Sequence, residues 1–143
     1  WGFWSGHSII YLTALDIFRD RPILGSGIKS FRVRCKLKMN KYSRICSLHT
    51  HNYYLEILTD TGLIGFVLFV GPIYFLLFKN LVSRSRENFE KHQIFFYSLM
   101  FILIIEFFPL KSSGSMFSTN SATYVFLILG LLLNDKIKNF FRD

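Results

Sequence analysis

The chain has 143 residues, of which 51% are hydrophobic and 18% aromatic, with 17 Phe among them. This apolar content, concentrated in runs, is typical of an integral membrane protein and excludes an ordinary soluble domain. In a soluble protein, the formal net charge of +8 would indicate binding to nucleic acid. In a membrane protein it instead favours lipid phosphates, so we expect a lipid bilayer and no nucleic acid as partner.

The N-terminal part begins in WGFWSGH, without an initiator Met or a signal-peptide pattern. We therefore expect a C-terminal fragment of a longer protein. The first predicted element is a helix over residues 9–18 (IIYLTALDIF), lying on the membrane surface or packed on other spans. Pro22 is expected to end it, and Gly25 and Gly27 in RPILGSG to allow a tight turn.

A basic run follows, with nine Lys or Arg between residues 19 and 44 against the single acid Asp20. Most of its lysines are typical of a solvated face or of contacts with anionic headgroups. Its arginines have planar forks that can bind phosphate oxygens bidentately. The four candidates for binding a diphosphate are Arg19, Arg21, Arg32 and Arg34.

The only two cysteines, Cys35 and Cys46, lie in or next to this basic run. If the segment is extracytoplasmic, they can form a disulfide that closes a short loop. The alternative is two unpaired thiols.

The stretch HTHN holds His49, His51 and Asn52 immediately before an apolar segment. An HxH pair can bind zinc, but only Cys46 and Glu56 could add a ligand nearby, so we expect no metal site. Histidine is an efficient general base because its pKa is near ambient pH. His49 and His51 are therefore candidates for catalysis, together with the neighbouring Asn52. The simpler interpretation is that Asn52 caps a short helix, YYLEILTDT, ending before Gly62.

Three apolar runs predict membrane spans, at residues 63–78, 94–108 and 122–133. The first contains Pro72, which a membrane helix tolerates when neighbours satisfy the freed carbonyl. Glu106, near the end of the second, is either an intramembrane functional carboxylate or an interfacial one. The chain thus divides into a loop (1–61), transmembrane helices (62–134) and a basic tail (135–143).

Orientation follows from the short connections, of which the 79–93 loop and the tail are basic while residues 110–121 contain only Lys111. The positive-inside rule then predicts a cytoplasmic C-terminus and a periplasmic segment 1–61. The basic charge of residues 19–44 opposes this assignment, but long loops translocate largely regardless of charge.

Two blocks, ALDIFRDRPILGSGIKSF and HTHNYYLEILTDTGLIGF, resemble the O-antigen ligase and O-antigen polymerase superfamily in order and spacing. The later FFPLKSSGSMFSTNSATYVFLILGL is similar to the stretch before the family's last spans. The resemblance runs from about residue 5 to 133. Relatives often have SGR where this chain has SGH, ending at His7.

The resemblance implies an all-α, polytopic, GT-C-like glycosyltransferase of the bacterial inner membrane that needs no cofactor. Its donor would be an undecaprenyl-diphosphate-linked glycan, and its acceptor another glycan or lipid A-core, in lipopolysaccharide biosynthesis. His51, beside Asn52, would be the essential loop histidine, and arginines would hold the diphosphate, with His7, Arg19 or Arg21 replacing the arginine of SGR. Two alternatives stay open: a transporter or channel with Glu106 on an ion path, and a metal-binding periplasmic loop.

Overall fold

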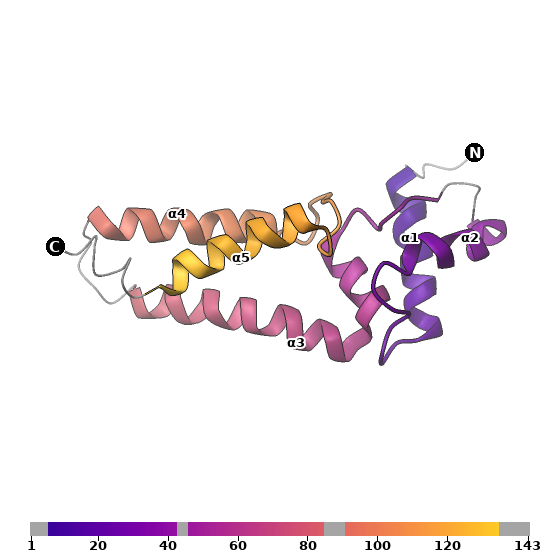
Figure 1. Ribbon diagram of the computed structural model, residues 1–143, viewed down its shortest axis with the longest axis horizontal. Coiled ribbons are helices and arrows are strands. Elements are labelled where there is room, and N and C mark those ends of the chain that lie inside the picture. Colours follow the sequence, from indigo (N-terminus) through magenta and orange to yellow (C-terminus); the bar gives the residue numbers. More distant parts are fainter. Residues whose placement is uncertain (1–5, 43–45, 85–90, 135–143) are drawn as a thin grey trace.

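The computed structural model describes residues 6–42, 46–84 and 91–134, which form five helices and no strand. In Figure 1 the last helices of the chain lie lengthwise at one end, and the first helices lie at the other. The predicted tail, 135–143, lies outside the described residues. The helices are α1 (Gly6–Asp20), α2 (Phe31–Tyr42), α3 (Tyr53–Arg84), α4 (Lys91–Glu106) and α5 (Thr119–Leu133).

The long part of α3 packs with α4 and α5 around a shared apolar core, whose central side chains include Ile73, Phe96 and Val125. The outward side chains are also apolar: Leu68, Phe75 and Leu127, for example, are 60–70% exposed. A helical layer that is apolar inside and outside is expected in lipid and not in water. The fold is therefore that of an all-α membrane protein.

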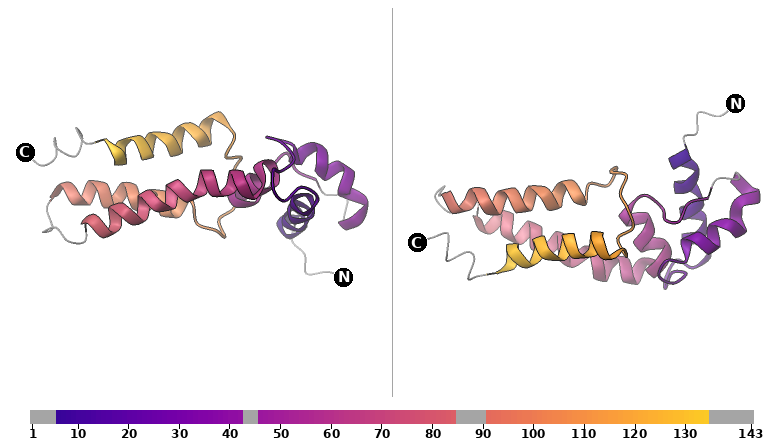
Figure 2. Two further views of the ribbon diagram at one scale, coloured as in Figure 1. Left: turned by 90° about the horizontal axis from the view of Figure 1, so that it is seen from below. Right: turned by 45° about the horizontal axis from the view of Figure 1, so that its top comes forward.

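The structure supports the predicted spans unequally. Among the described residues, one helical segment, Tyr53–Val82, is long and apolar enough to cross a membrane. The segments Ile94–Glu106 and Thr119–Leu133 are shorter apolar helices that lie alongside it (Figure 2). The expected helices are present, and the number of spans stays a prediction.

The helix α3 has a break at Gly62, whose φ of 68° and ψ of −169° are not helical. Its first part is the short helix that the sequence predicted, and Asn52 caps it as expected: Oδ1 accepts from the N–H groups of Tyr54 and Leu55 at 3.1 and 3.2 Å. The predicted turn also forms, because Gly25 and Gly27 have φ of 73° and 103°.

The 22–27 turn docks directly on the break in α3, a contact that the sequence did not predict. Backbone groups freed by the break pair with backbone groups of the turn, as buried polar groups must. The four bonds are Ser26 N–H to Thr59 O (2.9 Å), Gly27 N–H to Asp60 O (2.9 Å), Leu63 N–H to Pro22 O (2.8 Å) and Ile64 N–H to Ile23 O (3.3 Å). The two backbones approach so closely that a Cβ on Gly62 would lie 2.3 Å from Ile23 O.

The helix α1 runs across the long axis of the bundle, in contact with α2 and α3 (Figures 1 and 2). Its buried face packs Ile10, Ala14 and Ile17 against Phe31 and Cys35 of α2. If the bundle spans the bilayer, α1 lies close to the membrane plane, and its place on the membrane surface stays a prediction.

The helix α2 was not predicted, because its sequence was interpreted only as a basic run. It begins next to the buried carboxylate of Asp60, which accepts from Lys29 N–H at 2.6 Å and from the Ser30 hydroxyl at 3.2 Å. A carboxylate stabilises the N-terminus of a helix by accepting from its free N–H groups.

Candidate functional site

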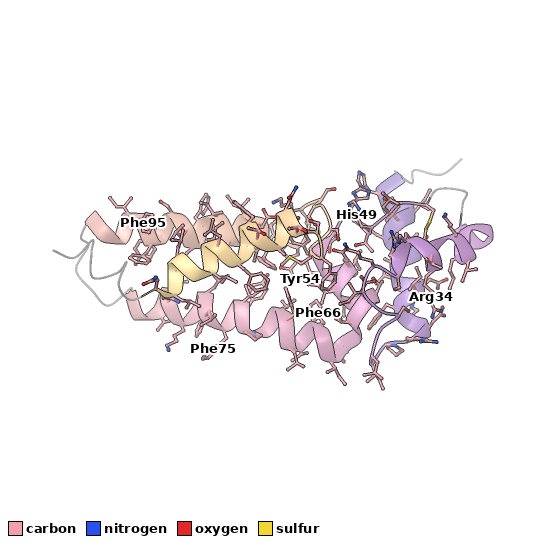
Figure 3. The ribbon with its side chains drawn as sticks, viewed as in Figure 1. Arg34, His49, Tyr54, Phe66, Phe75 and Phe95 are labelled. Carbon is pink, nitrogen blue, oxygen red and sulfur yellow. A yellow bond between two sulfur atoms is a disulfide. The ribbon has the colours of Figure 1, made fainter. Side chains whose placement is uncertain are left out.

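Three histidine rings meet near the point where α1 passes the HTHN stretch. The ring centroid of His51 lies 4.2 Å from that of His49 and 5.2 Å from that of His7. Figure 3 shows His49 at the junction between the bundle and the α1–α2 end. The structure thus brings both histidines of the HTHN stretch together with the histidine that ends the SGH segment.

The backbone of His51 is held in an uncommon conformation, with φ of +56°. A non-glycine residue with positive φ is uncommon and persists when its surroundings impose it. Here the His51 carbonyl accepts from Ser113 N–H at 2.9 Å and from the Tyr11 hydroxyl at 3.5 Å. The helix α1 and the loop between α4 and α5 therefore both hold the residue that carries the central ring.

Asn52 has a second role besides capping α3. Its side-chain amide donates to the carbonyls of Pro109 and Lys111 at 2.7 and 3.5 Å. The side chain is buried, so both bonds form away from water. Asn52 thereby joins the HTHN stretch to the loop between α4 and α5, and among the described residues its side chain forms no hydrogen bond to a histidine ring.

Glu56 is a residue whose role sequence reasoning missed, since it was considered only as a metal ligand. Its buried carboxylate accepts from the Ser115 hydroxyl at 2.5 Å and from Met116 N–H at 2.6 Å. It thus fastens the same loop to the first turn of α3. The signal in the sequence was an acidic residue in the apolar stretch YYLEIL, which needs a partner when buried.

The environment of the rings favours their neutral form. Burial lowers the pKa of His49. Burial also lowers the pKa of His51, and the nearby His49 and His7 lower it further because two adjacent positive charges repel. His51 is therefore neutral at pH 7, which is the form in which an imidazole accepts a proton.

The four candidate arginines do not gather at the histidines. Arg19 lies in the last turn of α1 and Arg21 just after it, at the end opposite His7, and the 12 residues from His7 to Arg19 rise ~18 Å along the helix. Arg19 is largely exposed, with Nη1 3.9 Å from Asp16 Oδ1. Arg34 is half-buried on α2, and Figure 3 shows it at the α1–α2 end.

Arg32 is the candidate arginine connected most directly to the histidines. It lines a cavity of about 590 Å³ between α2 and the segment that leads to HTHN. The Ser47 hydroxyl lies 2.9 Å from His51 Nε2, and Ser47 lines the same cavity. The complete lining is Arg32, Val33, Lys36, Cys46, Ser47 and Leu48. Lys36, expected to be a solvated lysine, thus borders this cavity.

Cys35 and Cys46 form a disulfide in the structure, with Cα atoms 5.9 Å apart. It joins buried Cys35 in α2 to the segment that carries Ser47. We predict that the bridge forms in the mature protein and stabilises it by roughly 3 kcal/mol through loop closure. Alkylation of the intact protein should label neither thiol before reduction and both afterwards. Equal labelling before and after reduction would contradict the bridge.

Glu106 lies at the end of α4 in contact with two polar partners. Its carboxylate accepts from the Tyr53 hydroxyl at 2.7 Å and forms an ion pair with Lys111. Glu106 is therefore a paired carboxylate at the end of α4. Within residues 6–42, 46–84 and 91–134, no group of three His, Cys, Asp or Glu is placed to hold a metal ion.

These features define the class of protein. It is a helical membrane protein with a cluster of histidines at one end of an apolar bundle. The family model described as O-antigen ligase matches residues 4–70, so this segment is similar to that family. The predicted superfamily is thereby confirmed, and it supports a role in O-antigen or related polysaccharide biosynthesis. The match contains the histidines and the 22–27 turn, and it ends before α4. No match was found among curated proteins or among solved structures.

Proposed function

We propose that the chain is part of an inner-membrane glycosyltransferase that moves a glycan from undecaprenyl diphosphate to a hydroxyl of an acceptor sugar. The observation that carries this proposal is the cluster of His7, His49 and His51 at one end of an apolar bundle, inside the segment that matches the O-antigen ligase family. Ligase and polymerase differ in the acceptor, which is a glycan or lipid A-core.

The geometry suits a donor that has an apolar tail and a polar head. The outer surface of α3, α4 and α5 is apolar, so a polyprenyl chain can lie against it within the bilayer. The histidines lie beyond the end of the apolar bundle, where a diphosphate would be at headgroup depth. The sugar would then lie in the aqueous phase beside His51.

In the proposed reaction, the acceptor oxygen attacks the anomeric carbon while neutral His51 takes the proton of that hydroxyl. The bond between the anomeric carbon and the diphosphate oxygen breaks, and its electron pair leaves on undecaprenyl diphosphate. Cationic side chains stabilise the charge that develops on the leaving group. Residues of this chain supply the base and the cations, and no cofactor is required.

Arg32 is the arginine that we expect to hold the diphosphate, because it lines the same cavity as Ser47, the hydrogen-bond partner of His51. Arg32→Lys keeps the charge but loses the bidentate fork. We expect glycan transfer by the full-length protein to fall about 10-fold, the loss of one charge-assisted hydrogen bond. Arg21→Lys is the matched control and should stay near the wild-type rate. If Arg21→Lys lowers transfer and Arg32→Lys does not, the diphosphate binds at the other end of α1.

The proposal also requires residues 1–61 to face the periplasm. Leu37, 75% exposed on α2, and Lys79, exposed near the far end of α3, are suitable positions for single cysteines in a background without Cys35 and Cys46. A membrane-impermeant thiol reagent should label Leu37→Cys in intact spheroplasts and Lys79→Cys only after the membrane is opened. The reverse labelling pattern would show the opposite topology, in which the histidines face the cytoplasm and cannot contact a periplasmic glycan.

A further inference from the structure

The hydroxyl of Ser47 is the one hydrogen-bond partner that the described residues provide for the ring of His51. Ser47 Oγ lies 2.9 Å from Nε2. Among residues 6–42, 46–84 and 91–134, no hydrogen bond to Nδ1 is found. The two ring nitrogens are therefore in different environments, and which of them carries the proton depends on Ser47.

The position of Ser47 is fixed through its neighbour in the chain. Cys46 is bonded to Cys35, which is only 1% exposed and packs among the side chains of α1 and the start of α2. The disulfide therefore anchors the residue before Ser47 to the core of the α1–α2 unit. This anchoring suits a side chain whose role is to orient another, since its own location must be reproducible.

We propose that Ser47 is a positioning residue that holds His51 with its proton on Nε2 and leaves Nδ1 as the nitrogen that accepts the proton of the sugar hydroxyl. The inference rests on the proposed function of His51 as general base. A neutral imidazole has one N–H and one lone pair. When Nε2–H donates to Ser47 Oγ, the lone pair is on Nδ1.

The same hydrogen bond assists the reaction itself. As the acceptor O–H bond breaks, a N–H bond forms on Nδ1 and the ring becomes an imidazolium. The bond from Nε2–H to Ser47 Oγ is then charge-assisted and stronger than in the neutral ring. Ser47 thus stabilises the state that forms during transfer more than the resting state, which is the condition for a contribution to rate.

Several other groups face His51 and contribute to its titration. His7 on α1 and His49 on the same segment lower its pKa, after the larger effect of burial. Tyr11 of α1 contacts its carbonyl, and the Lys111 ammonium on the opposite loop is paired with Glu106. Among the residues that the structure describes, the cations Arg32 and Lys36 line the cavity that Ser47 borders. None of these changes when Ser47 is replaced, so a shift in a Ser47 variant reports this hydrogen bond.

The test measures protonation of His51 without relying on transfer. Diethyl pyrocarbonate modifies neutral imidazole, and fragment-ion mass spectrometry locates the product at His51 in the full-length protein. The rate of modification against pH gives a midpoint, which should lie below that of an unperturbed histidine in the wild type. Ser47→Ala should move the midpoint downward, because the imidazolium loses its acceptor. Ser47→Thr should restore it, and Ser98→Ala, which removes an exposed hydroxyl of α4, should leave it unchanged.

Transfer gives the second readout. Ser47→Ala should lower the rate about 10-fold, and Ser47→Thr should retain most of it. An upward shift of the midpoint would show that Ser47 donates to Nε2, and would overturn the inference, as would an unshifted midpoint. If the midpoint moves downward but transfer is insensitive to both Ser47 and His51, the hydrogen bond stands and the proposed function fails.

Discussion

Replacing His51 should lower glycan transfer by the full-length protein ~10²–10⁴-fold, the usual contribution of a general base. The neutral ring lies at the centre of the histidine cluster, and its backbone is held by Ser113 and Tyr11. Since His51 has φ of +56°, Ala at this position also introduces backbone strain. His51→Asn is therefore the sharper variant, because Asn tolerates this conformation and cannot act as a base. Initial rates with a lipid-linked donor measure the effect.

His49→Ala is the matched control for His51. The ring centroid of His49 lies 4.2 Å from that of His51, but His49 does not share the hydrogen bond to Ser47 that orients His51. We expect a smaller loss, with normal expression of both variants. A rate that survives His51→Asn and collapses with His49→Ala would assign the base to the other ring. If both variants transfer glycan at the wild-type rate, the HTHN stretch serves only as a helix cap.

Replacing Gly62 should destabilise the protein by at least about 3 kcal/mol, the combined effect of a glycine-only backbone conformation and a steric clash. Its φ of 68° and ψ of −169° are inaccessible to other residues without strain. A Cβ there would lie 2.3 Å from Ile23 O and 2.5 Å from Gly25 N. Because these atoms belong to backbone that is itself hydrogen-bonded, they cannot move aside cheaply. Gly62→Ala should therefore separate the 22–27 turn from α3, and thermal unfolding in detergent measures the loss.

Gly71→Ala is the control for Gly62, since it lies in the same helix and a Cβ there meets nothing within 4 Å. Its stability should equal or slightly exceed that of the wild type, because Ala favours helix. Equal unfolding temperatures for Gly62→Ala and Gly71→Ala would mean that the close contact between turn and helix does not form.

Local signals in the sequence predicted much of the fold. Apolar runs located α3, α4 and α5, Pro22 and the glycines located the turn, and Asn52 marked a helix start. Each of these depends on residues within a few positions along the chain, so a single sequence contains the information. The helix α2 was missed for the same reason: FRVRCKLK alternates apolar and basic residues, and only contact with α1 buries Phe31 and Cys35 while leaving Leu37 exposed.

Long-range contacts account for the rest of the candidate site. The clamp from Glu56 to Ser115 and Met116 joins residues about 60 positions apart. Likewise, the sequence placed four arginines in one basic group, yet α1 separates Arg19 from the histidines, while the disulfide segment brings Arg32 near them through Ser47. Periodicity does not encode such pairings, because they depend on how helices dock.

The most direct test of the proposed function is to reconstitute the full-length protein in liposomes with an undecaprenyl-diphosphate-linked oligosaccharide and a glycan acceptor. Transferred glycan and released undecaprenyl diphosphate should appear in equal amounts, without added metal, and both should be lost with His51→Asn. Movement of the intact lipid-linked glycan across the bilayer, with no cleavage of its diphosphate bond and no effect of His51→Asn, would contradict a glycosyltransferase and indicate a transporter.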